Sequence, residues 1–286
     1  MIKSISYWCF KDGLANEHPV EAALQEAASA GFEGVELCIS TEGEISVTSS
    51  QSDCEEIRHK IDASGLVVET LASGMSWAFN PTSNDAGVRE KAVELHERAL
   101  ERAAWLGCDA LLFVPGVVNS PIAPDEHIRP DHALARCREN VVRLLETADR
   151  VGVDLCLENV WNGMFYSATE FRQFLDDINH PRLGAYLDLG NLVGVDQYPP
   201  HWIEILGHRI KRVHIKDFKH QFDWAGSYDF CDLLEGDVPF AASLQTLEDI
   251  GYDSTIVAEM LPWKPGRVEK TSMAMDRLLR RERVSS

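Results

Sequence analysis

The chain has 286 residues, 45% of them hydrophobic, and its 27 Lys and Arg against 46 Asp and Glu give a formal net charge of −19. This length is close to the roughly 250 residues of a (β/α)8 barrel and allows one large domain with a sizeable core. The negative charge disfavours binding to nucleic acid and to anionic membrane surfaces.

The cysteines and the N-terminus bear on the cellular compartment. The seven cysteines are scattered and form no CxxC pair, which is typical of a reducing interior. The segment MIKSISYWCF has too little apolar length for a signal peptide, and no stretch approaches the roughly 18 apolar residues of a membrane span. We therefore expect a cytoplasmic protein without a membrane partner.

Short apolar runs rich in Val, Ile and Leu alternate with helical patterns along the chain. The runs predict eight strands, at residues 2–8, 34–40, 65–72, 110–116, 154–160, 183–190, 211–217 and 254–260. The helical patterns between them include residues 19–31, 84–107, 131–152, 167–178, 240–251 and 267–283. Ser167 and Glu170 predict a capping box at one helix start. This alternation predicts a single (β/α)8 TIM barrel over residues 1–286, with a long loop after the seventh strand at about 217–238.

Each of the last four predicted strands ends near a residue that can bind a metal ion. These residues are Glu158, Asp188, His214 and Glu259. In a parallel barrel all strand C-termini open onto one face, so we expect the four side chains to converge there. Three carboxylates and one imidazole suit Mn²⁺, Mg²⁺ or Co²⁺. The sequence therefore predicts one divalent metal ion with coordination positions left for substrate.

Such a centre predicts proton transfer at carbon. If two adjacent oxygens of a hydroxyketone chelate the cation, it stabilises the enediolate that forms when a proton leaves carbon. Glu158 and Glu259 are then the expected acid and base of an epimerisation. One charged residue at a strand end is more often a solvated rim residue. The prediction rests on four of them in successive strands.

Several segments carry a family resemblance: LENVW, YLDLGN, RVHIKDF and the stretch from LLEGDVPF to VAEM. Together they resemble the xylose-isomerase-like TIM barrel superfamily, particularly the ketose and phosphoketose 3-epimerases of the L-ribulose 5-phosphate, L-xylulose 5-phosphate and D-tagatose types. The resemblance implies a divalent metal, most often Mn²⁺ but also Zn²⁺ in some relatives, held by Glu158, Asp188, His214 and Glu259. It also implies that Glu158 and Glu259 are the acid/base pair, and it leads us to expect a homodimer or homotetramer.

Two positions depart from the pattern of epimerases that act on unphosphorylated ketoses. Asn191 stands where those enzymes carry a His three residues after the metal Asp. His220 stands where they carry an Arg six residues after the metal His. The Asp-x-Gly-Asn form is closer to the phosphoketose branch. We therefore expect a sugar or sugar phosphate as substrate, with the phosphate favoured.

Other side chains near strand ends are candidate substrate contacts. They are Trp8, Glu36, Trp77, Trp161, Asn191, Lys216 and His220. Glu36, at the end of the second predicted strand, hydrogen-bonds substrate or a ligand, or is a solvated rim residue. Strand alternation turns Lys216 to the interior face, where it binds a substrate oxygen or phosphate, or pairs with a neighbouring carboxylate. The tryptophans either form an apolar wall against the sugar or simply pack. His96, on a predicted helix, is expected at the surface.

Other functions use a similar metal set. Aldose–ketose isomerases, hydroxypyruvate-type isomerases and inosose-type dehydratases share the metal ligands, so they stay open as alternatives. An abasic-site endonuclease of the same superfamily needs more His and carboxylate ligands, and the early strands lack the extra histidines. It also needs a cationic groove for DNA, which the net charge of −19 disfavours. A non-catalytic sugar- or metal-binding protein also stays open.

Overall fold

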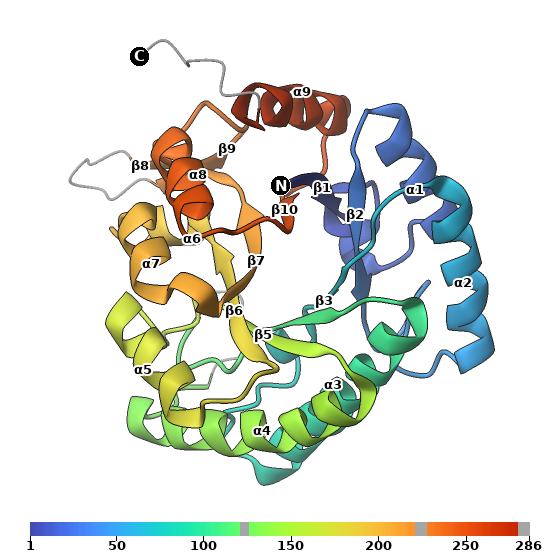
Figure 1. Ribbon diagram of the computed structural model, residues 1–286. Helices are drawn as coiled ribbons and strands as arrows, with labels where there is room; N and C mark the ends of the chain where they lie inside the picture. Colours follow the sequence, from blue (N-terminus) through green and yellow to red (C-terminus); the bar gives the residue numbers. More distant parts are fainter. Residues whose placement is uncertain (121–125, 221–227, 280–286) are drawn as a thin grey trace.

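A computed structural model of the protein describes residues 1–120, 126–220 and 228–279. Eight parallel strands close into a barrel in the order β1-β10-β7-β6-β5-β4-β3-β2, with helices around it (Figure 1). The barrel strands are β1 (Ile2–Ser6), β2 (Gly34–Ile39), β3 (Thr70–Ser73), β4 (Ala110–Phe113), β5 (Asp154–Glu158), β6 (Leu183–Asp188), β7 (Ile210–Ile215) and β10 (Thr255–Ala258). All eight predicted strands are present, and the closed barrel confirms the predicted (β/α)8 fold.

Helices follow the barrel strands and cover their outer faces (Figure 1). They are α1 (Val20–Ser29), α2 (Gln51–Ser64), α3 (Ala86–Leu106), α4 (Pro130–Val151), α5 (Ala168–Ile178), α6 (Leu189–Val193), α7 (Pro199–Leu206), α8 (Phe240–Asp249) and α9 (Arg267–Leu279). Single turns of 3₁₀ helix lie at η1 (Tyr7–Cys9), η2 (Gly13–Ala15), η3 (Met75–Trp77) and η4 (Gly207–Arg209). The last predicted helix reached residue 283, and its part beyond Leu279 lies outside the described residues.

Helix α4 shows how local sequence sets these boundaries. Pro130 occupies the first turn, where its missing N–H costs no hydrogen bond, and Gly152 ends the helix with φ +79°. Between them, buried residues such as Cys137, Val141 and Leu144 recur at helical spacing and face the barrel.

The predicted capping box of α5 is wrong. Ser167 does stand at the N-cap, but its side chain makes no capping hydrogen bond to the helix backbone. Its hydroxyl instead lies 2.7 Å from the Thr169 hydroxyl. A nearby hydroxyl has thus replaced the backbone N–H as the partner of the serine.

The long segment predicted after the seventh strand contains a two-stranded hairpin. Strands β8 (Asp217–His220) and β9 (Tyr228–Cys231) pair in antiparallel fashion. The Asp217 carboxylate accepts hydrogen bonds from the backbone N–H groups of Gly236 at 2.8 Å and Val238 at 3.2 Å. A Cβ at Gly236 would lie 2.3 Å from Asp217 Oδ1, so this close approach requires glycine. The base of the hairpin is therefore held against the barrel rim.

Strand register brings the predicted metal ligands to one level of the barrel. Glu158 lies opposite Tyr186, and Asp188 lies opposite His214. His214 in turn lies opposite Val257 of β10, two residues before Glu259 and so on the same face of the chain. Among the described residues, no helix has the length and apolar character needed to cross a membrane.

Candidate functional site

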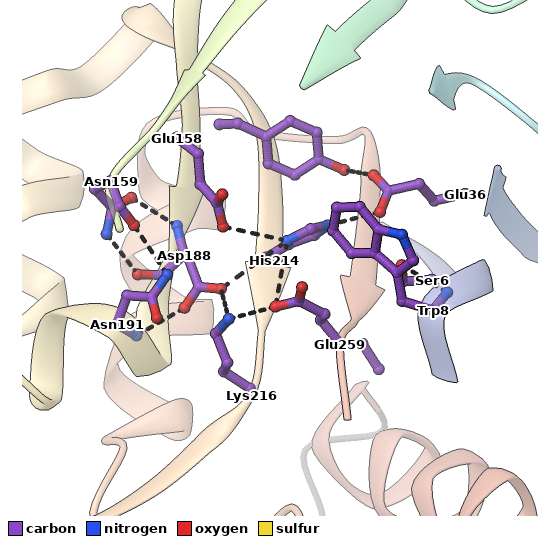
Figure 2. Close-up of polar contacts among 12 residues, drawn as sticks. Ser6, Trp8, Glu36, Glu158, Asn159, Asp188, Asn191, His214, Lys216 and Glu259 are labelled. Carbon is purple, nitrogen blue, oxygen red and sulfur yellow. Dashed lines mark hydrogen bonds and ion pairs between the residues drawn. The ribbon is translucent and has the colours of Figure 1, made fainter. Parts of the chain in front are cut away.

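The four predicted metal ligands meet at the C-terminal end of the barrel. Glu158, Asp188, His214 and Glu259 each offer one ligand atom, and these atoms lie within 4.8 Å of one another. His214 Nδ1 lies 3.8 Å from a Glu158 oxygen, 3.9 Å from Asp188 and 3.9 Å from Glu259 (Figure 2). All four side chains are buried. The convergence expected from the strand ends is thus present.

The His214 imidazole supports a bound cation in this cluster. His214 Nδ1 is buried and has no hydrogen-bond partner, and Asp188 Oδ2 is buried with the Lys216 ammonium 3.0 Å away as its ion-pair partner. Buried polar atoms are normally satisfied, so an imidazole nitrogen that faces three carboxylates without a partner indicates a missing partner. A divalent cation can accept an electron pair from this nitrogen, and three carboxylates with one imidazole suit a hard metal such as Mn²⁺ or Mg²⁺. The residues therefore fit the expected metal.

Glu36 contacts His214 on the side of the imidazole opposite to the three other cluster carboxylates. His214 Nε2 lies 2.8 Å from Glu36 Oε1, and Glu36 Oε2 accepts hydrogen bonds from Thr70 Oγ1 at 3.1 Å and from the Tyr186 hydroxyl. Burial acts to raise the pKa of Glu36, but the charge and hydrogen bond of His214 lower it. This carboxylate directs Nδ1 of His214 toward the other ligands, as outer-shell carboxylates do at metal centres. Glu36 was expected to hydrogen-bond substrate or a ligand, or to be a solvated rim residue. It is fully buried, and its contact with the candidate metal ligand His214 matches the second of these possibilities, a hydrogen bond to a ligand.

Asn159 binds the Asp188 backbone, and Asn191 binds the Asp188 carboxylate. Asn159 Nδ2 donates to the Asp188 carbonyl at 2.9 Å, and Asn159 Oδ1 accepts from the Asp188 N–H at 2.8 Å (Figure 2). The Asn191 N–H donates to Asp188 Oδ1 at 2.7 Å, while Asn191 Nδ2 donates to the Asn159 carbonyl at 3.0 Å. The Asn191 side chain thus links α6 to the segment after β5, and the residue also lines the cavity beside the site.

Lys216 lies among the carboxylates. Its ammonium is 3.0 Å from Asp188 Oδ2 and forms a close ion pair with Glu259 (Figure 2). Burial acts to lower the pKa of Lys216, but Asp188 and Glu259 raise it above its ordinary value. Both alternatives for this residue are therefore compatible with its position, because it pairs with carboxylates and also lines the cavity.

Burial also changes the carboxyl groups. It raises the pKa of Glu158 to about 7, with His214 acting in the opposite direction and Glu259 adding to the rise. Burial raises the pKa of Asp188 as well, against the lowering effect of Lys216. For His214, burial acts to lower the pKa, but Glu36 and the other carboxylates raise it well above its ordinary value. A group with a pKa near 7 can both accept and donate a proton at neutral pH.

A cavity of about 390 Å³ lies directly over the metal-binding residues. Its polar end contains Glu158, Glu259, Lys216 and Asn191. The rest of its lining is mainly apolar and consists of Trp8, Leu14, Ser73, Gly74, Trp77, Val114, Ser120, Val160, Trp161, Phe230 and Leu261. The three tryptophans predicted near strand ends therefore all face this cavity.

His220 has a different position. It lies in β8 outside the cavity lining, and its Nε2 pairs with Asp196 at 2.6 Å. The expected surface position of His96 is wrong, because this residue is fully buried. Its Nδ1 lies 2.7 Å from the Ala92 carbonyl and its Nε2 lies 3.0 Å from Ser73 Oγ.

Some residues of the site were not predicted from the sequence. Phe230 comes from the hairpin after β7 and stacks on Trp161, with ring centroids 5.1 Å apart. Only the length of that insertion indicated a functional segment. Tyr186 and Thr70, which bind Glu36, lie inside the barrel. Tyr186 is two residues before Asp188, so strand alternation could have placed both on one face.

The chain is similar to known proteins over most of its length. The family model for the Xylose isomerase-like TIM barrel matches residues 24–278. The chain belongs to this family. The family match confirms the resemblance found in the sequence motifs around the four ligands.

Relatives within the xylose isomerase-like family carry different activities. A 3-oxo-isoapionate decarboxylase of Pectobacterium atrosepticum is 26% identical over 273 residues, which cover 92% of this chain and 86% of the relative. The L-ribulose-5-phosphate 3-epimerase UlaE of Escherichia coli (strain K12) is 26% identical over 240 residues, which cover 83% of this chain and 80% of the relative.

Solved structures share the fold. D-psicose 3-epimerase with D-tagatose from Clostridium cellulolyticum H10 has a TM-score of 0.78 at 18% identity, covering 98% of this chain and 99% of that one. The 3-keto-D-glucoside 4-epimerase YcjR from E. coli has a TM-score of 0.72 at 15% identity, covering 98% and 100%. At these identities the likeness shows the fold of the xylose isomerase-like family alone.

Proposed function

We propose that this protein is a divalent-metal-dependent sugar epimerase or isomerase that moves a proton at a carbon next to a carbonyl, as in 3-epimerisation of a ketose. The observation that carries the proposal is the buried convergence of Glu158, Asp188, His214 and Glu259 under a cavity. Relatives that are 3-epimerases support the reaction type.

The four ligands define what a bound cation would contribute. It would place positive charge beside the substrate oxygens and stabilise the negative charge that develops there when carbon loses a proton. Mn²⁺ is the metal we expect, because the donors are mostly carboxylate oxygens.

Glu158 and Glu259 are placed to exchange protons with a substrate in the cavity. Both line it, and they come from β5 and from the end of β10, which are separated in the barrel by β6 and β7. A sugar between them has one carboxyl group on each side. In one direction Glu158 removes the proton and Glu259 delivers a proton to the opposite face, which inverts the carbon.

A decarboxylase is the second candidate, since a relative with that activity matches 92% of this chain. Loss of CO₂ from a 3-oxo acid leaves negative charge on the same kind of oxygen, so an equivalent site can serve both reactions. The two reactions differ in product. Decarboxylation releases CO₂, whereas epimerisation exchanges a carbon-bound proton with solvent.

The test uses Mn²⁺-loaded protein in deuterated water with a panel of pentuloses, hexuloses, their phosphates and a 3-oxo sugar acid. NMR locates incorporated deuterium, and a coupled assay measures CO₂. We expect deuterium at C3 of at least one ketose; label only at C1 or C2 indicates aldose–ketose isomerisation, and CO₂ release indicates a decarboxylase.

Variants test the roles of the residues. Glu158→Gln is expected to abolish exchange at carbon while only weakening metal binding. Glu146→Gln, an exposed position on α4, removes the same charge away from the site and serves as the control. An active Glu158→Gln enzyme would remove Glu158 from the mechanism. Binding of sugars without any turnover would favour a non-catalytic binder.

A further inference from the structure

A second cavity of about 150 Å³ adjoins the active-site cavity. The two share Trp8, Leu14 and Gly74, so they lie side by side and meet at these residues. The second cavity is built by the segments that follow β1, β2 and β3, and its further lining includes Ser40 and Ala78. None of the four metal-binding residues lines it. It therefore extends the site away from the reacting centre.

Among the lining residues that the structure describes, charge is confined to the metal end of these two cavities. In the described lining of the active-site cavity the ionised residues are Glu158, Glu259 and Lys216, and Lys216 is already paired with Asp188 and Glu259. Among the described residues that line the second cavity, none is an acid, a lysine, an arginine or a histidine. A phosphate placed there would lose its water without gaining a cation. The distal part of the substrate is therefore expected to be uncharged.

The size and surface of the space fit a second sugar ring. The volume of the active-site cavity alone, about 390 Å³, lies within the roughly 300–1,000 Å³ of pockets that hold a drug-sized ligand, which is larger than one hexulose. The Trp8 side chain lines both cavities and offers an apolar aromatic surface to the C–H groups of a sugar. Ser40 and Thr41 add hydroxyl-bearing side chains to the second cavity, which can donate to or accept from sugar hydroxyls.

We infer that the substrate is an uncharged sugar longer than one hexulose, with its ketose unit at the carboxylates and a second sugar unit in the cavity between the segments after β1, β2 and β3. This inference rests on the proposed function for the location of the reacting unit. It differs from the sugar phosphate favoured by the sequence comparison at Asn191 and His220.

The test compares three sugars that differ only at O6: D-fructose, D-fructose 6-phosphate and isomaltulose, in which O6 carries a glucose. Their dissociation constants for the Mn²⁺-loaded protein are measured by calorimetry. We expect isomaltulose to bind about tenfold more tightly than fructose, and fructose 6-phosphate to bind about tenfold more weakly than fructose. Any other order of affinity, or binding of none of the three, overturns the inference.

A variant locates the second unit. Ala78→Phe places a large side chain in the second cavity, at a residue with helical backbone angles that any L-residue adopts. It should lower the affinity for isomaltulose relative to fructose by about tenfold. Ala63→Phe, at an exposed position of α2, is the matched control and should leave this ratio unchanged. An unchanged ratio in Ala78→Phe would show that the second unit does not occupy this cavity.

Proton exchange is assayed separately with the same sugars. If the order of affinities holds but no carbon-bound proton exchanges, the epimerase proposal fails and the distal subsite stands. If exchange occurs but the order is different, the subsite fails and the epimerase proposal stands.

Discussion

Glu36→Gln offers a direct test of how the metal centre is built. Glu36 is fully buried and accepts hydrogen bonds from His214, Thr70 and Tyr186. Glutamine has nearly the same shape, so the barrel interior should stay packed. What changes is the charge beneath His214, and with it the hydrogen bond that orients the imidazole. The expected result is weaker metal binding by a protein that is still folded.

The size of the effect follows from the type of contact. His214 Nε2 and Glu36 Oε1 are 2.8 Å apart in a site without solvent exposure, where a charge-assisted hydrogen bond is strong. Loss of such an outer-shell partner typically lowers metal affinity by about 10- to 100-fold, or roughly 1.4–2.7 kcal/mol. We therefore expect the Kd for Mn²⁺ to rise by this factor in Glu36→Gln.

Calorimetric titration with Mn²⁺ measures this change, and circular dichroism checks the fold. Glu139→Gln, at an exposed site on α4, removes one negative charge far from the cluster and controls for the mean field of the protein. ¹⁵N NMR of His214 provides a readout of imidazole orientation. In the metal-loaded wild type the proton should be on Nε2, and this preference should weaken in Glu36→Gln. A folded Glu36→Gln protein with wild-type Mn²⁺ affinity would refute the positioning role of Glu36.

Three further predictions concern the stability of the site and its surroundings. Burial lowers the pKa of His96 from 6.5 to about 4, so its contribution to stability is present above pH 6.5 and is lost as pH falls toward 4. Between pH 7.5 and pH 5 the free energy of unfolding of the wild type should thus fall by about 2 kcal/mol more than that of His96→Gln. Urea titrations at both pH values measure this difference, and equal losses in the two proteins would contradict the prediction. Lys216→Met removes the cation that lies among the buried carboxylates of Glu158, Asp188 and Glu259, so the free energy of unfolding of the metal-free variant should fall by about 3–5 kcal/mol. Mn²⁺ should restore much of this stability, as measured by thermal melting. A metal-free variant that melts like wild type would contradict this role. Asn159→Ala removes both hydrogen bonds to the Asp188 backbone, so the free energy of unfolding should fall by about 1–3 kcal/mol and Mn²⁺ binding should weaken. An unchanged Kd for Mn²⁺ would show that Asp188 does not need these hydrogen bonds to bind the metal.

The sequence predicted the metal ligands because they follow from local pattern. Each of Glu158, Asp188, His214 and Glu259 lies at or next to the C-terminal end of an apolar strand, and parallel strands in a barrel must present their C-termini at one face. The closed barrel then brings their ligand atoms within 4.8 Å of one another. The expected dimer or tetramer and the cytoplasmic location stay predictions.

The failed predictions concern contacts that depend on packing. His96 lies on the same face of α3 as the buried Ala92 and Ala99, so helical spacing could have placed it inside. Its hydrogen-bond partners, the Ala92 carbonyl and the Ser73 hydroxyl, become evident only in the packed structure. The Ser167 side chain makes no capping hydrogen bond and instead lies 2.7 Å from the Thr169 hydroxyl. Such choices between competing hydrogen-bond partners depend on distances that one-dimensional patterns do not contain.

The sequence by itself determined the fold class and the four residues of the candidate metal cluster, since strand periodicity and residue chemistry are local properties. Only the tertiary structure placed Glu36 beneath His214 and Lys216 between Asp188 and Glu259. It also joined Trp8, Leu14 and Gly74 into the wall shared by two cavities. Most of these contacts join residues from different strand ends, so they depend on how the strands are arranged around the closed barrel.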